Sequence, residues 1–204
     1  KQMLMISGFD RYYQIARCFR DEDLRADRQP EFSQVDIEAS FVTTEDIISL
    51  IEGLLKRCFK EAIDTSINLP FQRMTYDEAM NKFGSDKPDT RFRIELVDLC
   101  ETFSDSEFKV FSGAIKDGGV VKAINAKNFA CVTTGQMNHL TETAQLHGAK
   151  GLAFIKVEDG EWKSPIVKFF SDKEKEELSE AMSIEEGDLI LFGAGDWLNV
   201  CEVL

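Results

Sequence analysis

The chain has 204 residues, 43% of them hydrophobic and 30% charged, with a formal net charge of −13. This length suits one large or two small globular domains, and the acidic balance argues against a surface that binds nucleic acid everywhere, while leaving room for a local basic groove. No apolar run approaches the length of a membrane span. Five widely spaced cysteines without a CxxC pair predict neither a zinc knuckle nor a disulfide framework, and they indicate a reducing compartment.

The first elements in chain order are a helix and a hairpin. Residues 1–6 show a helical pattern that Gly8 ends, because glycine adopts positive φ without strain. Two β-rich segments, residues 12–20 and 32–41, then flank a short loop made almost entirely of charged residues. The sequence therefore predicts an antiparallel hairpin with a charged tip.

Two capped helices are predicted after the hairpin. Thr43 or Thr44 can cap the first, and its apolar residues recur at helical spacing through about Ile63. This stripe is broad enough to cover a sheet. Thr75, with Glu78 three residues later, fits a capping box at the start of a short second helix.

The composition changes after a turn-rich joint at residues 85–89. Residues 95–103 and 108–115 alternate loosely between apolar and polar side chains, and no helix is predicted there. The later predicted elements are a strand at 120–126, a helix at 134–147, a strand at 151–157, a helix at 173–182, a strand at 189–193 and a helix from 196 onward. The second part is thus predicted to be a compact α/β module.

Arginine is concentrated around the hairpin loop. Arg17, Arg20, Arg25 and Arg28 fall within twelve positions, interleaved with acidic residues. Guanidinium groups bind phosphate and carboxylate oxygens bidentately and stack on flat bases, while carboxylates beside them can hold ammonium groups. The hairpin is predicted to be a meeting place for a nucleoside triphosphate and a zwitterionic small molecule. The alternative is an arginine-rich hairpin with surface ion pairs only.

The sequence of this hairpin resembles that of a known enzyme family. FRDEDLRADRQPEFSQVDIE, at residues 19–38, is similar to motif 2 of the class II aminoacyl-tRNA synthetases in the form found in aspartyl-tRNA synthetases, and residues 1–18 are similar to the preceding segment. GAKGLAFIK at 148–156, SPIVKF at 164–169 and EGDLILFGA at 186–194 resemble the GAD domain inserted in the bacterial type. The resemblance thus covers essentially the whole chain.

This resemblance implies a mixed α+β and α/β fold in two domains. Residues 1–91 would be part of the antiparallel-sheet catalytic domain, and residues 92–204 a compact α/β GAD insertion domain that is C-terminally incomplete. Since Lys1 is not an initiator Met, and since motif 1, motif 3 and the anticodon-binding domain are not recognised, the chain is predicted to be a piece of a longer polypeptide.

The family activates aspartate with ATP to aspartyl-adenylate and transfers the aspartyl group to the 3′ end of tRNA(Asp). The resemblance implies a cytoplasmic bacterial ligase with ATP as substrate, no membrane partner, and Mg²⁺ whose main ligands lie outside this chain. The full-length enzyme would be a homodimer, with its dimer motif outside the chain. The 204 residues alone are predicted to have little or no adenylation activity.

The resemblance also implies residue roles. Arg20 would be the catalytic residue, bridging the substrate carboxylate and the α-phosphate, where developing charge needs a fixed cation. Predicted ATP contacts are Arg20, Glu22, Gln29 and the adenine-stacking Phe32. Predicted aspartate contacts are Lys1, Arg20, Gln34 and Asp36. Predicted contacts to the tRNA acceptor end are Arg25 and Arg28, and no metal ligand is predicted in the chain.

Purely structural roles are possible for these residues, and other functions are possible for the whole chain. Arg20 could simply pair with Asp21 or Asp23, and a strand bearing Gln34 and Asp36 could be a half-exposed sheet edge. The chain could also be a non-catalytic tRNA-binding module or an amidotransferase-subunit relative that uses only the GAD fold, or a regulatory paralogue that makes an adenylate without charging tRNA. An ATP-binding hairpin argues against the amidotransferase alternative.

Overall fold

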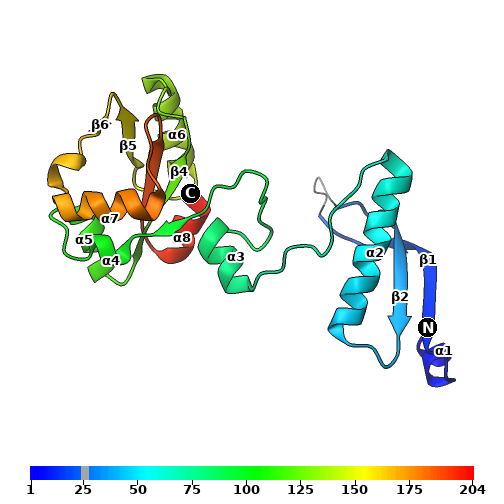
Figure 1. The fold of residues 1–204 in the computed structure, drawn as a ribbon. Coiled ribbons are helices and arrows are strands. Elements are labelled where there is room, and N and C mark those ends of the chain that lie inside the picture. Colours follow the sequence, from blue (N-terminus) through cyan, green and yellow to red (C-terminus); the bar gives the residue numbers. More distant parts are fainter. Residues whose placement is uncertain (24–27) are drawn as a thin grey trace. The chain divides into compact units, whose positions relative to one another are not determined.

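The computed structural model describes residues 1–23 and 28–204 and divides into two compact units, Lys1–Arg73 and Met74–Leu204 (Figure 1). The compact units thus divide before the domain boundary predicted at residues 91 and 92, because helix α3 (Tyr76–Phe83) packs against helix α8 (Trp197–Val203) of the second unit. In the part of the chain that the structure describes, no helix combines the length and apolar character needed to cross a bilayer.

The first unit is built around the predicted hairpin. Its elements are α1 (Gln2–Ile6), β1 (Arg11–Phe19), β2 (Glu31–Ala39) and α2 (Thr44–Ile63). The two strands pair antiparallel in a continuous register that sets Arg11 opposite Ala39 and Phe19 opposite Glu31. The predicted hairpin is therefore confirmed, with each strand starting within a residue of its expected position.

Helix α2 begins at Thr44, directly after a threonine N-cap, as the sequence predicts. Thr43 accepts a hydrogen bond from the backbone N–H of Asp46, and Asp46 accepts one from the backbone N–H of Thr43, so Thr43 rather than Thr44 is the N-cap. Glu52 is the one buried residue of α2, and its Oε1 accepts a hydrogen bond from the backbone N–H of Phe71 at 2.9 Å. The apolar stripe of α2 stays largely exposed, so this unit buries little surface of its own.

The second unit contains a five-stranded sheet in the order β3-β4-β7-β5-β6, and all its strand pairs are antiparallel. Its elements after α3 are β3 (Val97–Asp98), α4 (Cys100–Phe103), α5 (Lys109–Lys116), β4 (Val120–Ala126), α6 (Thr134–Leu146), β5 (Ala153–Glu158), β6 (Glu161–Lys163), η1 (Val167–Phe169), α7 (Asp172–Met182), β7 (Leu189–Gly195) and α8. The mixed fold class is confirmed, in its antiparallel form.

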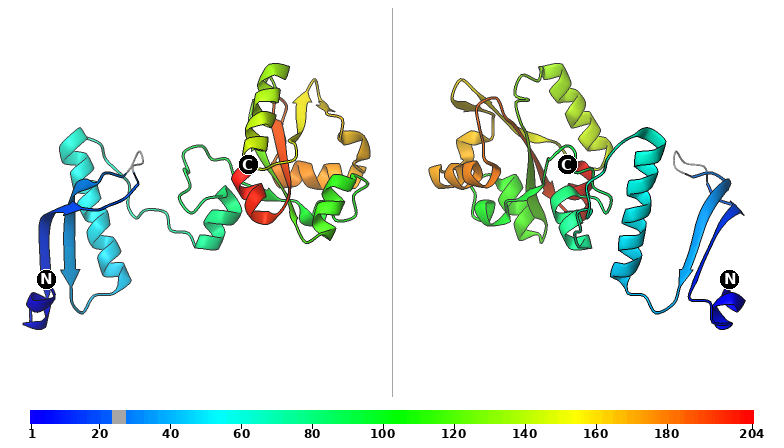
Figure 2. Two further views of the ribbon diagram at one scale, coloured as in Figure 1. Left: turned by 180° about the vertical axis from the view of Figure 1, so that it is seen from behind. Right: turned by 45° about the vertical axis from the view of Figure 1, so that its right-hand side comes forward.

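Helices cover both faces of this sheet (Figure 2). Because strand side chains alternate, Ile190 and Phe192 of β7 face the core under α4, α5 and α7, while Leu189 and Leu191 face Met137 of α6. Five of the seven β7 residues are buried, so β7 runs through the middle of the domain core.

The loose alternation of apolar and polar residues in 95–103 and 108–115 does not predict the two helices that form there. α4 and α5 lie there, and they deliver Phe103 and Phe111 into the core, where the two rings lie 5.1 Å apart between centroids. Phe103 also packs on Phe170 at 4.8 Å and on Phe192 at 6.3 Å. Helices of one or two turns are too short to show a helical period in the sequence, so tertiary burial of these aromatic rings decides the structure.

Both ends of helix α3 are defined by local chemistry. Thr75 and Glu78 form the predicted reciprocal capping box, and Gly84 ends the helix at φ 65°. A Cβ at Gly84 would lie 2.2 Å from the backbone oxygen of Cys201, so glycine is required both by the left-handed backbone and by the close approach of α8.

Candidate substrate site on the hairpin

The predicted substrate residues share one face of β2. Phe32, Gln34 and Asp36 are half-buried, whereas the residues between them are exposed. Their Cα partners across the hairpin are Cys18, Ala16 and Gln14. The period-two alternation that predicted this common face is therefore confirmed by the burial pattern.

Lys1 joins this face through two carboxylates. Its Nζ lies 2.9 Å from Asp36 Oδ1 and 2.9 Å from Glu38 Oε1. Although a terminal residue tends to fray, both ion pairs fix this side chain over the β2 strand. Gln14 Nε2 donates to Asp36 Oδ2 at 3.4 Å and completes the cluster.

The ion pairs of this cluster favour the protonated form of Lys1 and the ionised form of Asp36. Hydrogen bonds to Glu38 and then Asp36 raise the pKa of Lys1 well above its usual range. The hydrogen bond from Lys1, aided by Gln14, lowers the pKa of Asp36 against a smaller opposing effect of desolvation. The Lys1 ammonium faces the Asp36 and Glu38 carboxylates. The cluster can therefore offer an ammonium to a carboxylate of an amino acid and a carboxylate to its ammonium.

Arg20 lies over the aromatic ring predicted to stack on adenine. Its Cζ is 5.2 Å from the centroid of the Phe32 ring, a cation–π distance. The Arg20 backbone N–H donates to the carbonyl of Pro30 at 2.9 Å, which closes the described end of the hairpin. The ion pair of Arg20 is with Glu22, at 3.7 Å, and not with Asp21 or Asp23, among the described residues. Three predicted ATP residues are thus adjacent.

The other predicted site residues are less connected. The Cys18 thiol donates to Gln34 Oε1 at 3.5 Å. Gln29 and Arg28 are exposed beside the loop, and Arg25 lies outside the described residues. Gln14 was not predicted, because finding it requires the register that sets it opposite Asp36.

The described residues do not form a metal site. No group of three or more His, Cys, Asp or Glu side chains within residues 1–23 and 28–204 is arranged to hold an ion.

The antiparallel hairpin thus sets an arginine over an aromatic ring and carries an ammonium–carboxylate cluster on the same face. The family model described as "tRNA synthetases class II (D, K and N)" matches residues 1–192, and the chain belongs to this family.

Its relatives are aspartate–tRNA ligases. The chain is 58% identical over 204 residues to the aspartate–tRNA(Asp/Asn) ligase of Opitutus terrae, covering 100% of this chain and 34% of the relative. It is 55% identical over 195 residues to the aspartate–tRNA ligase of Halalkalibacterium halodurans, covering 95% and 33%. It is 56% identical over 195 residues to the aspartate–tRNA(Asp/Asn) ligase of Bacillus subtilis, covering 95% and 33%. The chain thus spans about a third of the length of these relatives.

Proposed function

We propose that this chain is part of an aspartate–tRNA ligase that activates aspartate with ATP and transfers it to the 3′ end of tRNA(Asp). The observation that carries the proposal is the Lys1–Asp36–Glu38 cluster on the same hairpin that sets Arg20 over Phe32. The names of the relatives and the family match support the same function.

Aspartate fits the ammonium–carboxylate cluster by exchange of ion pairs. The side-chain carboxylate of the substrate takes the Lys1 ammonium, and the substrate α-ammonium takes the Asp36 carboxylate that Lys1 releases. Gln34, two residues before Asp36 on the same face, adds a hydrogen-bonding amide. Because each ion pair replaces another, the substrate enters without leaving a charge unpaired.

Adenylation then uses the other half of the hairpin. The α-carboxylate oxygen of aspartate attacks the α-phosphorus of ATP, the bond from that phosphorus to the bridging oxygen breaks, and pyrophosphate leaves. Phe32 supplies a flat ring for the adenine, while Glu22 and Gln29 contact the nucleotide. Arg20 holds the reacting carboxylate and the α-phosphate together and stabilises the charge that develops on the phosphoryl oxygens. Mg²⁺ would accompany ATP and shield its phosphate charge, with its main ligands outside this chain.

The transfer step brings in tRNA. Arg25 and Arg28, which lie in the sequence between the two strands, contact the acceptor end, and this contact weakens with salt because phosphate contacts release counterions. The ligase acts in the bacterial cytoplasm as a homodimer. The non-catalytic and amidotransferase alternatives are less well supported, since the family match begins at residue 1 and includes the hairpin.

Calorimetric titration with a non-hydrolysable aspartyl-adenylate analogue tests the proposal. In the full-length ligase, Arg20→Ala is expected to weaken binding at least about tenfold, because a charge-assisted contact to phosphate and carboxylate is lost. Arg57→Ala is the matched control, since this exposed arginine of α2 pairs only with Glu61 in the described residues. Equal affinity in the Arg20 and Arg57 variants would contradict the assignment. The 204-residue chain alone is expected to show little aspartate-dependent pyrophosphate exchange.

A further inference from the structure

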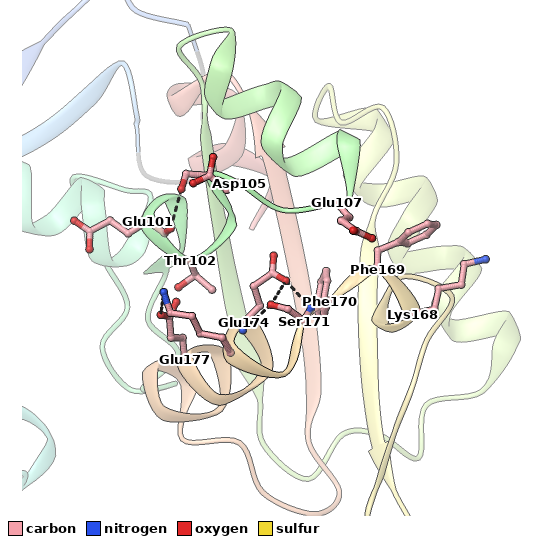
Figure 3. A pocket seen from close by; sticks show the side chains of 12 residues that line it. Glu101, Thr102, Asp105, Glu107, Lys168, Phe169, Phe170, Ser171, Glu174 and Glu177 are labelled. Atoms are coloured by element: carbon pink, nitrogen blue, oxygen red, sulfur yellow. Dashed lines mark hydrogen bonds and ion pairs between the residues drawn. The ribbon is translucent and has the colours of Figure 1, made fainter.

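The pocket of the second unit is built around a side chain that serves the fold (Figure 3). It has a volume of about 400 Å³ and lies between the segment from Glu101 to Glu107 and the segment from Lys168 to Glu177. The carboxylate of Glu174 caps α7 by accepting hydrogen bonds from Ser171 N and Ser171 Oγ, both at 2.6 Å. This carboxylate is therefore committed to its own helix, whereas the amide of Gln34 on the hairpin keeps a donor for a ligand.

Strand β1 places three side chains on the face that carries the predicted substrate residues of β2. These are Gln14, Ala16 and Cys18, which share one face because they occupy alternate positions of the strand. The antiparallel register sets Gln14 opposite Asp36 and Ala16 opposite Gln34. Ala16 carries only a methyl group, so the side chain of Cys18 can reach diagonally across the hairpin to Gln34. Each polar substrate residue of β2 therefore has a hydrogen-bond partner on β1.

The contact with Cys18 decides which end of the Gln34 amide faces the substrate. The thiol sulfur lies 3.5 Å from Gln34 Oε1 and 3.9 Å from the carbonyl oxygen of Ala16, so its single proton favours the nearer acceptor. Because a carbonyl oxygen accepts more strongly than a thiol sulfur, the amide turns its oxygen toward Cys18. Among the described residues, Cys18 is the one hydrogen-bond partner of the Gln34 side chain, so Nε2 is left to donate. A free N–H donor suits a carboxylate, and aspartate has two.

Gln14 makes the corresponding contact with Asp36. Its Nε2 donates to Asp36 Oδ2 at 3.4 Å, while the Lys1 ammonium lies 2.9 Å from Oδ1 and 3.1 Å from Oδ2. The hydrogen bond from Lys1 is the largest cause of the lowered pKa of Asp36, and the one from Gln14 acts in the same direction. When the Lys1 ammonium moves to the substrate, Gln14 is the described side chain that still holds the Asp36 carboxylate. A neutral donor fixes this carboxylate and leaves its charge for the substrate ammonium.

We propose that Gln14 and Cys18 are positioning residues of the aspartate site. Cys18 turns the Gln34 amide so that its N–H donates to a carboxylate of the substrate. Gln14 holds the Asp36 carboxylate toward the substrate ammonium once Lys1 has moved to the substrate. This inference rests on the proposed function and adds the groups that orient its substrate contacts. Both side chains act through their β2 partners and do not touch the reacting atoms.

Aspartate-dependent ATP–pyrophosphate exchange by the full-length ligase tests the Cys18 contact. Cys18→Val is close to the wild type in size but removes the donor, and it should raise the KM for aspartate about three- to tenfold, the effect of one hydrogen bond. Cys18→Ser restores a donor and should return this KM to within about twofold of the wild-type value. The KM for ATP should stay unchanged in both variants. Cys131→Val, at an exposed cysteine of the second unit, is the matched control and should change neither KM.

The same assay tests the Gln14 contact and the coupling of Cys18 to Gln34. Gln14→Met keeps an unbranched side chain but removes the donor, and it should raise the KM for aspartate about three- to tenfold without changing that for ATP. This variant should fold, because Gln14 is exposed. In a Gln34→Ala background, Cys18→Val should add less than about a twofold rise, since the amide that it orients is absent.

The two KM values separate a positioning role from a structural one. Cys18 lies opposite Phe32 in the register, so a general distortion of the hairpin would raise the KM for ATP as well. Equal rises in both KM values, or no recovery in Cys18→Ser, would overturn the inference. A wild-type KM for aspartate in Cys18→Val and Gln14→Met, with a raised KM in Gln34→Ala, would overturn it and leave the proposed function standing. An unchanged KM for aspartate in both Gln34→Ala and Asp36→Asn would contradict the proposed aspartate site and this inference together.

Discussion

Replacing Asp188 with asparagine should destabilise the second unit strongly although it changes only one atom. Asp188 is 1% exposed. Its Oδ2 accepts from Asn125 Nδ2, Lys127 Nζ and Glu185 N, each at 2.9 Å, and its Oδ1 accepts from Asn128 N at 3.2 Å. In the least damaging orientation, the new amide group faces the Asn128 N–H, so two donors oppose each other and that hydrogen bond is lost.

The magnitude follows from these contacts. An unpaired buried donor costs about 1–3 kcal/mol. Loss of the negative charge also weakens the bond from Lys127, although this term is small because the Lys127 side chain is 44% exposed. Together these effects predict a loss of about 1–4 kcal/mol, within the stability of an ordinary domain, so the variant should still fold.

Urea unfolding followed by tryptophan fluorescence measures this loss in the correct part of the chain. Both tryptophans, Trp162 and Trp197, lie in the second unit. Asp86→Asn is the control, because Asp86 is an exposed aspartate of the same unit. A loss below about 0.5 kcal/mol for Asp188→Asn, equal to that of the control, would refute the reasoning.

The lowered pKa of Asp188 also predicts how the stability difference between wild type and Asp188→Asn changes with pH. Desolvation would raise the pKa of Asp188, but Lys127, Asn125 and two backbone N–H groups outweigh it, and the folded pKa is lowered. A lowered folded pKa stabilises the protein above the unfolded pKa of about 3.9, and this stabilisation is lost as the pH falls through the folded value. The difference between wild type and Asp188→Asn should therefore be largest near neutral pH and shrink below about pH 4.

Three further predictions concern the core, a helix cap and the substrate cluster. Phe103→Ala should cost about 3–5 kcal/mol in the same urea assay, because Phe103 is 0% exposed and contacts three other rings; a loss under about 1 kcal/mol would contradict the packing. Thr133→Ala should cost about 1 kcal/mol through loss of the α6 cap, and an unchanged midpoint would argue against it. In the full-length ligase, Asp36→Asn should weaken the adenylate analogue at least about tenfold, whereas Glu61→Gln should not; equal affinities would remove Asp36 from the site.

Local chemistry explains which parts of the fold could be predicted from the sequence. The start of α3 was predicted to the residue from Thr75 with Glu78, and that of α2 to within one residue from Thr43 or Thr44, because a cap involves only neighbours in the chain. The β4 strand was also predicted to the residue. By contrast, α4 and α5 depend on the burial of Phe103 and Phe111 against rings from distant segments, and no short-range pattern reports that burial.

The candidate site shows the same division. The common face of Gln34 and Asp36 follows from strand alternation alone, whereas Gln14 belongs to the cluster only because the register of the hairpin sets it opposite Asp36.

The order of strands in the second unit also determines when its sheet can assemble on the ribosome. β7 lies between β4 and β5, so the pair β3–β4 and the pair β5–β6 have no direct contact in the sheet until β7 is inserted between them. All four of these strands are synthesised before β7. Their inward-facing Val121, Ala123 and Ile155 therefore remain uncovered by their central neighbour during elongation. The nascent chain should stay sensitive to proteases and available to chaperones until residues 189–195 have left the exit tunnel, and then gain protection in a single late step.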